Sequence, residues 1–555
     1  MFRVRFFLAA IVLLLLSLTV RATTAALPVE RKYAILHGWD ILSATTEDVY
    51  RNRAKFAATG ADGIVMPVDG WDAKGKPIRG RYLMTATGWT AANFAKTKKQ
   101  LAEMSRMKGL KESFALMFWS PLRRLSWTND VEWSNFASNA ALMVRIAKDA
   151  GLKGVCIDHE DYCKTQQFLW MCPDGDYDTV AKVARSRGRQ IFKAMADEFP
   201  DARFLSFWFF SEPLKAIRSR RAEDVCRANG NLWIDFLNGA VDVLPPTAKF
   251  IDGGERHGYK AVVDTDGFRN AYWTTACGTL PLVSPELREK YRKLLSVGIA
   301  QYVDKYLADF EWAFKPIGSS MVARCADNMF EAGAICDECV WLYGENGTWI
   351  DWDSKWHKNR QFPTWESQIP GLADIIRLSV GDYASLRRAV KEGRAKNLVS
   401  NPHCDPASSD GKVPPPFEAC AEQKWATSAM TACVADIGAA RPGALRYGGG
   451  GAITFKSAEA LKPGQVVYAN LKAKGDYPVA NVAWCKDGRW NWHPDCHYLA
   501  TPSSVNERGW KTLEGCFTVP EGAEGVGLIL SGAASLEKPV YFDDIGLFVC
   551  PEFAK

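Results

Sequence analysis

The chain lacks several patterns that identify common classes of enzyme. No glycine-rich phosphate-binding loop follows its first strand-like run, Tyr33 to Asp40, which disfavours a doubly wound nucleotide-binding sheet. No GxSxG nucleophile elbow occurs, so an esterase-type or amidase-type hydrolase has no support. Cys336 and Cys339 form a lone CxxC with no second pair, which is poor evidence for zinc. We therefore expect neither a metal nor a cofactor.

The chain also lacks a strong charge of either sign. Its 69 basic and 63 acidic residues leave a formal net charge of +6. Arg3, Arg5 and Arg21 contribute three of these charges and lie near the N-terminus, so the remainder is closer still to neutral. Proteins that bind nucleic acid carry a pronounced basic excess. We therefore predict no nucleic-acid partner.

Only one segment of the sequence is long and apolar enough to insert into a membrane. Arg3 and Arg5 precede the apolar run Phe6 to Val20, and small residues follow at Ala22, Ala25 and Ala26. A basic start, a short apolar run and small residues make up a secretory signal peptide, although a retained anchor is the alternative. We predict a signal peptide over residues 1–26 and a secreted, periplasmic or cell-surface protein without membrane contact after its removal.

Strand-like apolar runs alternate with helical stretches through the first two thirds of the chain. This alternation predicts an α/β fold with a parallel sheet, and eight repeats favour a (β/α)8 TIM-type barrel over residues 27–390. A doubly wound open sheet is the rival architecture. The expected strands are residues 33–40, 63–70, 113–120, 151–162, 204–210, 249–255, 296–304 and 339–346.

The pattern of residue types along the chain changes after about Gly381. Short strands separated by glycine and proline turns replace the helical periodicity, which predicts an antiparallel β-sandwich over residues 397–555. Trp490, Trp492 and Tyr498 are aromatic residues of this region. They are candidates for a sugar-binding platform or for the core of the sandwich.

The stretch GLKGVCIDHEDY, Gly151 to Tyr162, is the centre of the predicted barrel. Strand side chains alternate, so Cys156, Asp158 and Glu160 share one face while Val155 and Ile157 share the other. If the apolar pair packs under a helix, both carboxylates point into the barrel mouth. Buried carboxylates destabilise a fold unless they are paired or solvated, so this arrangement predicts a catalytic role.

Acidic and aromatic residues also follow the other predicted strands, where the active sites of such barrels are built. A mouth lined in this way suits cleavage of a glycosidic bond, which needs a proton donor, a second carboxylate and flat surfaces for sugar rings. We predict Glu160 as the proton donor. Asp158 either raises the pKa of Glu160 by like-charge repulsion or holds its proton by a hydrogen bond. The expected substrate-binding residues are His37, Trp39, Asp69, Trp119, Trp208, Asp252, Tyr302, Trp341 and Tyr343.

GVCIDHEDY resembles the fourth-strand signature of chitinase-like glycoside hydrolase barrels. Gly154, Asp158 and Glu160 match that signature, and Trp341 matches the tryptophan that lies under the reacting sugar in the family. The resemblance implies a glycosidase barrel with Glu160 as the acid. Lys153 and Cys156 stand where the family has earlier acids, so assistance by a substrate acetamido group is not implied.

Without substrate assistance a second protein carboxylate is needed. Glu255, on the loop after the sixth strand, and Glu345, after the eighth, are the candidates. Glu255 is favoured because Gly253 and Gly254 allow a close approach to a ligand. His257 with Asp252 and Glu255 fits no established metal motif. The predicted partner is a poly- or oligosaccharide, and the alternative function is non-catalytic carbohydrate binding or surface adhesion.

The C-terminal region carries a resemblance of its own. NLVSNPHC, PGQVVYANLKAKG and VYFDDIGL resemble segments of the galactose-binding-like sandwiches found as carbohydrate-binding modules beside exported glycosidases. The resemblance spans Asn397 to Cys550 and implies a module that binds glycan or serves as a spacer.

Overall fold

The computed structural model describes most of the chain after residue 31. The predicted signal peptide therefore lies outside the described residues. The described ranges are 32–85, 87–212, 221–316, 321–352, 362–406, 413–421, 431–434, 436–457, 459, 461, 465–476, 478–491, 497–498, 508–520, 522–532, 534–535 and 537–549.

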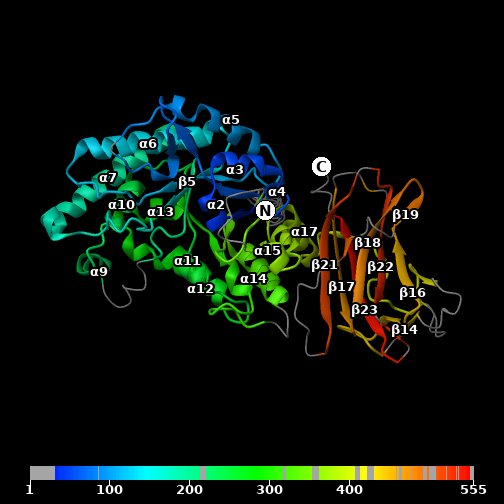
Figure 1. The fold of residues 1–555 in the computed structure, drawn as a ribbon. Helices are drawn as coiled ribbons and strands as arrows, with labels where there is room; N and C mark the ends of the chain where they lie inside the picture. The colour runs from blue at the N-terminus through cyan, green and yellow to red at the C-terminus, as the bar shows by residue number, and fades with distance from the viewer. Residues whose placement is uncertain are drawn as a thin grey trace, which may run out of the picture. The chain divides into compact units, whose positions relative to one another are not determined.

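The predicted barrel is present as a nearly closed parallel sheet (Figure 1, blue to green). Its strands follow the order β10-β11-β1-β2-β5-β6-β7-β8-β9. Only Gly298 separates β9 from β10, so the two ends of this path are halves of one extended segment. The strands are β1 (Tyr33–Leu36), β2 (Gly63–Met66), β5 (Phe114–Phe118), β6 (Gly154–Asp158), β7 (Arg203–Ser206), β8 (Lys249–Asp252), β9 (Leu295–Val297), β10 (Ile299–Tyr302) and β11 (Cys339–Tyr343).

Side-chain alternation divides the strand residues between two cores. Cys156 of β6 and Trp341 of β11 belong to the cluster that fills the barrel. Val155, Ile157 and Val340 belong to the larger cluster between the strands and the surrounding helices. The predicted inward face of β6 and β11 is confirmed, and it directs the carboxyl end of each strand toward the mouth.

The helices surround the sheet, and some of them begin at residues whose side chains accept hydrogen bonds from their free N–H groups. The Asn129 side chain accepts from the first turn of α6, and Asp176 accepts from Thr179 at the start of α7. The helices are α2 (Trp39–Ser43), α3 (Thr46–Arg51), α4 (Arg53–Ala57), α5 (Ala95–Met104), α6 (Asp130–Asp149), α7 (Tyr177–Glu198), α9 (Ala222–Ala228), α10 (Trp233–Val243), α11 (Glu255–Gly258), α12 (Gly267–Trp273), α13 (Arg288–Leu294), α14 (Met321–Ile335), α15 (Trp365–Gln368), α16 (Leu372–Ser379) and α17 (Gly381–Lys391).

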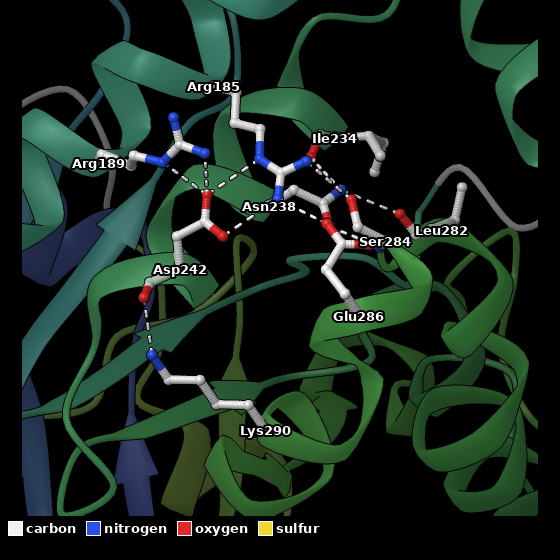
Figure 2. A network of polar contacts seen from close by, with 9 residues as sticks. All are labelled: Arg185, Arg189, Ile234, Asn238, Asp242, Leu282, Ser284, Glu286 and Lys290. Atoms are coloured by element: carbon white, nitrogen blue, oxygen red, sulfur yellow. Dashed lines mark hydrogen bonds and ion pairs between the residues drawn. The ribbon is translucent and has the colours of Figure 1, made fainter.

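A polar network on the outside of the barrel ties α7 to α10 and to the segment before α13 (Figure 2). Asp242 of α10 accepts hydrogen bonds from Arg185 Nε at 2.9 Å and from Arg189 Nε at 2.7 Å. Arg185 also bonds to Ser284 and pairs with Glu286. Burial raises the pKa of Asp242, but the two arginines outweigh it and the pKa is lowered overall. The carboxylate is therefore ionised and structurally paired.

Two predicted strands differ from their expected length. The run at 63–70 breaks at Pro67, which has no N–H for the ladder, and resumes as the hairpin β3 (Asp69–Trp71) and β4 (Pro77–Arg79). The run at 204–210 ends at Ser206, because the backbone N–H groups of Phe209 and Phe210 donate to Asp252 instead of a neighbouring strand.

The predicted antiparallel sandwich follows the barrel in the chain (Figure 1, yellow to red). One sheet has the order β14-β15-β23-β17-β21, with β12 beside β23, and the other β13-β16-β22-β18-β19, with β20 beside β18. Both sheets contribute to one apolar cluster. The strands are β12 (Lys396–Asn397), β13 (Phe417–Ala421), β14 (Thr431–Val434), β15 (Ala444–Tyr447), β16 (Gly451–Lys456), β17 (Val466–Lys474), β18 (Pro478–Lys486), β19 (Arg489–Asn491), β20 (His497–Tyr498), β21 (Lys511–Thr518), β22 (Gly525–Gly532) and β23 (Val540–Val549).

Among the described residues, every helix is too short or too polar to span a lipid bilayer. The predicted aromatic platform of the sandwich is described only at Trp490, whose ring lies over Gly527 of β22. Trp492 and the Tyr498 side chain lie outside the described residues.

Candidate active site

A cavity of about 750 Å³ opens where β6, β7, β8, β10 and β11 end. Four glutamates from four different segments share it, together with aromatic and basic side chains. Carboxyl ends of barrel strands are where such folds place their chemistry. The lining residues are Glu160, Phe207, Trp208, Glu212, Glu255, Arg256, Tyr259, Lys260, Tyr302, Lys305, Trp312, Tyr343 and Glu345.

Glu160 is held by its neighbours in the chain. The Asp158 carboxylate accepts the Glu160 backbone N–H at 3.1 Å. The Tyr162 hydroxyl lies between the two side chains, 3.0 Å from Asp158 Oδ2 and in hydrogen-bonding contact with Glu160 Oε2. A phenol has one proton to donate, so the two acids and the phenol form one proton-sharing chain. The arrangement fixes the orientation of Glu160.

The electrostatics of this chain distinguish the two acids. Asp158 is fully buried, and burial followed by the charge of Glu160 raises its pKa well above the usual value. Burial also raises the pKa of Glu160, while the Tyr162 hydrogen bond opposes that rise. The pKa of both acids is thus raised, and the fully buried Asp158 retains a proton more readily than Glu160, whose rise the Tyr162 hydrogen bond opposes.

Glu255 has the most strongly perturbed carboxyl group of the cavity lining. It opens α11 directly after β8. Burial and then the charge of Glu160 raise its pKa to about 8, and the neighbouring Tyr259 opposes the rise. Glu255 consequently carries a proton at neutral pH. It does not pair with Arg256, because that guanidinium binds Glu212 at 2.7 Å.

Glu345 completes the group of carboxylates. Tyr343 donates its hydroxyl to Glu345 Oε1 at 2.9 Å. The backbone N–H groups of Glu345 and Asn346 donate to Asp304 at 2.9 and 2.8 Å. Asp304 is thus a support of the loop after β11, and Glu345 faces the cavity in a fixed position.

Aromatic side chains form the walls. The rings of Tyr259 and Tyr302 stack with centroids 5.0 Å apart, and Tyr302 stacks in turn on Tyr343 at 5.9 Å. Trp312 lies at the edge with 63% of its surface exposed. Flat faces of this kind suit the apolar faces of sugar rings. Trp208, Tyr302 and Tyr343 therefore occupy the region expected from the sequence.

Asp69 and Asp252 are structural residues, contrary to prediction. Asp252 is fully buried and accepts from three successive backbone N–H groups and from the Ser211 hydroxyl at 2.6 Å. Asp69 accepts the Thr46 N–H at 3.0 Å and pairs with Arg79 at 3.2 Å. Strand parity explains Asp252, since its neighbour Ile251 belongs to the interior cluster and Asp252 faces away from it.

The prediction that Trp119 lines the mouth is also wrong. Trp119 is fully buried outside the strands and packs edge-on against Phe136 of α6, Phe192 of α7 and Trp233 of α10. Its neighbour Phe118 belongs instead to the interior cluster. Trp119 therefore contributes to the packing of helices on the barrel.

Trp341 and His37 lie beneath the cavity. Trp341 donates its indole N–H to Gly253 O and stacks on Phe207 with ring centroids 4.8 Å apart. Phe207 therefore covers the face of the Trp341 ring on which the resemblance predicts that a sugar stacks. His37 is buried against Phe207, and burial lowers its pKa to about 3. Trp39 is partly buried against the same interior cluster and is not a lining residue.

Several lining residues were missed from the sequence. Tyr259 and Lys260 follow Glu255 by about one helical turn, a spacing that could have identified them. Tyr162 at the end of the central stretch was missed as well; it bonds to Glu160 but is not a lining residue. Lys305 and Trp312 lie in an irregular segment after β10 that has no periodicity to follow.

Among the described residues, one group of side chains has spacing suited to a metal ion, and it lies in the sandwich. It consists of His403, Asp543 and Asp544. His403 Nδ1 is 2.7 Å from Asp544 Oδ1, and Asp543 accepts the Ala439 N–H at 2.7 Å. These internal bonds account for the cluster without a metal.

Comparison with known proteins gives no family assignment. No protein-family model and no curated protein matches the chain. Matching structures include the CBM22-1 xylan-binding domain of Paenibacillus barcinonensis Xyn10C, with 13% identity over 28% of this chain and 96% of that one and a TM-score of 0.21. TmCBM61 in complex with β-1,4-galactotriose matches with 17% identity over 28% of this chain and 99% of that one, TM-score 0.19.

The active domain of Bacteriophage CBA120 tailspike protein 4 matches with 12% identity over 28% of this chain and 21% of that one, TM-score 0.21. The chain thus spans about a fifth of the length of that tailspike domain. Similarities at these scores carry no argument about activity.

Proposed function

We propose that the protein is an exported glycoside hydrolase that cleaves a glycosidic bond in a poly- or oligosaccharide. One observation carries the proposal: Glu160, Glu212, Glu255 and Glu345 converge in one aromatic-walled cavity at the carboxyl end of a barrel. Cleavage of a glycosidic bond by protein groups needs two carboxyl groups in different protonation states.

The pKa of both Glu160 and Glu255 is raised, and the larger rise at Glu255 supports distinct roles for the two acids. Glu255, whose pKa is raised to about 8, keeps a proton at neutral pH and donates it to the leaving oxygen. Glu160, which accepts from Tyr162, is the ionised carboxylate that stabilises the sugar cation, attacks it or activates water. This assignment reverses the sequence-based one, in which Glu160 is the donor and Glu255 the second carboxylate.

The remaining parts of the proposal concern the rest of the chain. Residues 1–26 are a signal peptide, residues 27–390 the catalytic barrel, and residues 397–555 a sandwich that binds glycan or serves as a spacer. Tyr302, Tyr343, Trp208 and Trp312 are the proposed sugar-stacking residues, because they line the cavity. Trp312 is exposed, Trp208 and Tyr343 are half-buried, and Tyr302 is buried.

The test compares hydrolysis of a glycan panel by the full chain and by matched glutamine variants. We expect Glu160→Gln and Glu255→Gln each to lower the rate by about 10²-fold or more, the range typical of general acid–base groups. Glu289→Gln, an exposed acid of α13, is the control and should retain full activity. Proton NMR of the first sugar anomer released then distinguishes retention from inversion.

Binding without turnover is the outcome that favours the alternative function. The sequence feature that suggests this alternative is the presence of Lys153 and Cys156 where the resembled family has acids. Neither residue lines the cavity: Lys153 pairs with Glu112, and Cys156 lies in the interior cluster. If the panel identifies a tight ligand and neither the wild type nor any variant releases sugar, the protein is a carbohydrate-binding or adhesion protein on a barrel scaffold.

A further inference from the structure

One wall of the cavity is basic. Arg256 and Lys260 lie on and just after α11, and Lys305 follows β10 in the short helical turn Val303–Tyr306. The Lys305 ammonium donates to Tyr259 O at 2.8 Å, which places it against the chain segment that carries Lys260. Two segments far apart in the sequence therefore bring three cations to the same wall, beside the exposed Trp312.

The charges on this wall are unequally compensated. Arg256 pairs with Glu212 at 2.7 Å. Within the described part of the chain, neither Lys260 nor Lys305 has a carboxylate within 4.0 Å. The Lys305 ammonium instead lies over the Phe314 ring at 4.2 Å and is half-buried. Two ammonium groups thus line the cavity with no anionic partner among the described residues.

This arrangement of like charges is electrostatically unfavourable. Burial and then the charge of Lys260 lower the pKa of Lys305, which reports both its desolvation and the repulsion between the two lysines. The charges of Arg256 and Lys260 also lower the pKa of the adjacent His257, after burial. Like charges held together with one of them half-buried are stabilised when an anion binds between them.

We propose that the glycan recognised by this cavity carries an anionic substituent, a carboxylate or a sulfate, on the sugar that contacts Lys260, Lys305 and Trp312. The proposal deepens the proposed function and rests on it. The tryptophan supplies a stacking face for the ring, and the two ammonium groups bind the substituent at its edge. The catalytic carboxyl groups, Glu160 and Glu255, lie in the same cavity and act on an adjacent bond.

A competing explanation is that the lysines only balance the glutamates of the site. That role would act on every substrate equally, because it operates through the field within the cavity and not through contact with a substituent. Anion recognition would instead affect acidic glycans alone and would appear in KM and Kd. The two explanations are therefore separable by substrate.

The experiment measures binding by calorimetry and hydrolysis by reducing-sugar release, using the full chain. The probes are matched pairs: oligogalacturonides with their carboxyl-reduced forms, and sulfated galactan oligosaccharides with their desulfated forms. We expect at least one acidic member to bind about tenfold or more tightly than its neutral counterpart, with the preference weakened by added salt. The two pairs separate carboxylate recognition from sulfate recognition.

Lys260→Gln with Lys305→Gln should abolish that preference, by weakening binding of the acidic member by about tenfold or more relative to binding of the neutral member. Lys182→Gln, an exposed lysine of α7, is the matched control and should change nothing. The single variants and the salt dependence of the wild type give the same information if the double variant is unstable.

The outcomes distinguish the two proposals. Equal binding of acidic and neutral members across both pairs overturns anion recognition, even where neutral glycans are hydrolysed. Equal loss on all substrates in the lysine variants overturns it as well, in favour of charge balancing. Preferential binding of an acidic member without any hydrolysis supports anion recognition and overturns the proposed enzyme.

Discussion

The cavity at the barrel mouth and the network on its outer surface contain the same kinds of charged residue in opposite arrangements. In the outer network, Asp242 is surrounded by Arg185 and Arg189, and its pKa is lowered (Figure 2). In the cavity, burial and then the charge of the nearby Glu160 raise the pKa of Glu255 to about 8. The acid paired with arginines stays ionised, whereas the buried acid beside other acids keeps its proton.

The two arrangements contribute differently to the protein. Paired charges with several hydrogen bonds stabilise the packing of helices. Clustered like charges destabilise the fold and persist where their shifted pKa values are used. Changes in the two regions should therefore have opposite consequences: variants of the cavity lower activity, and variants of the network lower stability.

The largest expected effect is on the pH dependence of activity. If Glu255 donates its proton, the rate falls about tenfold per unit as pH rises above its pKa of about 8. Glu255→Gln removes this alkaline limb along with most of the activity, and Asp242→Asn retains it. The measurement is kcat/KM for the best panel substrate from pH 4 to 10. A limb that persists in Glu255→Gln would falsify the assignment of the donor.

The second effect is on stability, and the two regions should differ in sign. Asp242→Asn removes charged hydrogen bonds to two arginines, so we expect the free energy of unfolding to decrease by about 1–3 kcal/mol and the Tm to fall. A carboxyl group with a folded-state pKa above its unfolded value destabilises the fold as pH rises. Because the raised pKa of Glu255 is about 8, Glu255→Gln should raise the Tm at pH 9 and change it little at pH 4.

Calorimetric or fluorescence melting curves at both pH values check this prediction, with Glu289→Gln as the control. A decrease of Tm at pH 9 for Glu255→Gln would show that this carboxyl group is paired in the folded protein, which contradicts the claim that its ionised form destabilises the fold.

The smallest effect concerns Tyr162. Its hydrogen bond lowers the pKa of Glu160, so Tyr162→Phe should raise that pKa and move the acidic limb of the rate profile to higher pH. We expect less than about a tenfold loss at the pH optimum, since one hydrogen bond to an ionised group is removed. Tyr50→Phe, whose hydroxyl bonds to Glu103 outside the cavity, is the control. An unmoved acidic limb contradicts the role given to Tyr162.

Much of the architecture could be predicted from local patterns. Alternation of strands and helices predicted the barrel, and alternation within β6 and β11 predicted the inward faces of Asp158, Glu160 and Tyr343. Trp119 could not be placed in this way. All five residues of β5 are apolar because a parallel strand is buried on both faces, so the run has no polar side to fix its orientation.

The sequence by itself determined which segments become strands and which side chains share a face, because these properties depend on neighbours in the chain. Only the tertiary structure decided which acids meet. Asp252 and Glu255 are three residues apart, yet one accepts the backbone N–H groups after β7 and the other enters the cavity. The protonation state of Glu255 and the charge of the wall beside Lys260 and Lys305 arise from residues distant in the sequence, since burial and Coulomb interactions act through space.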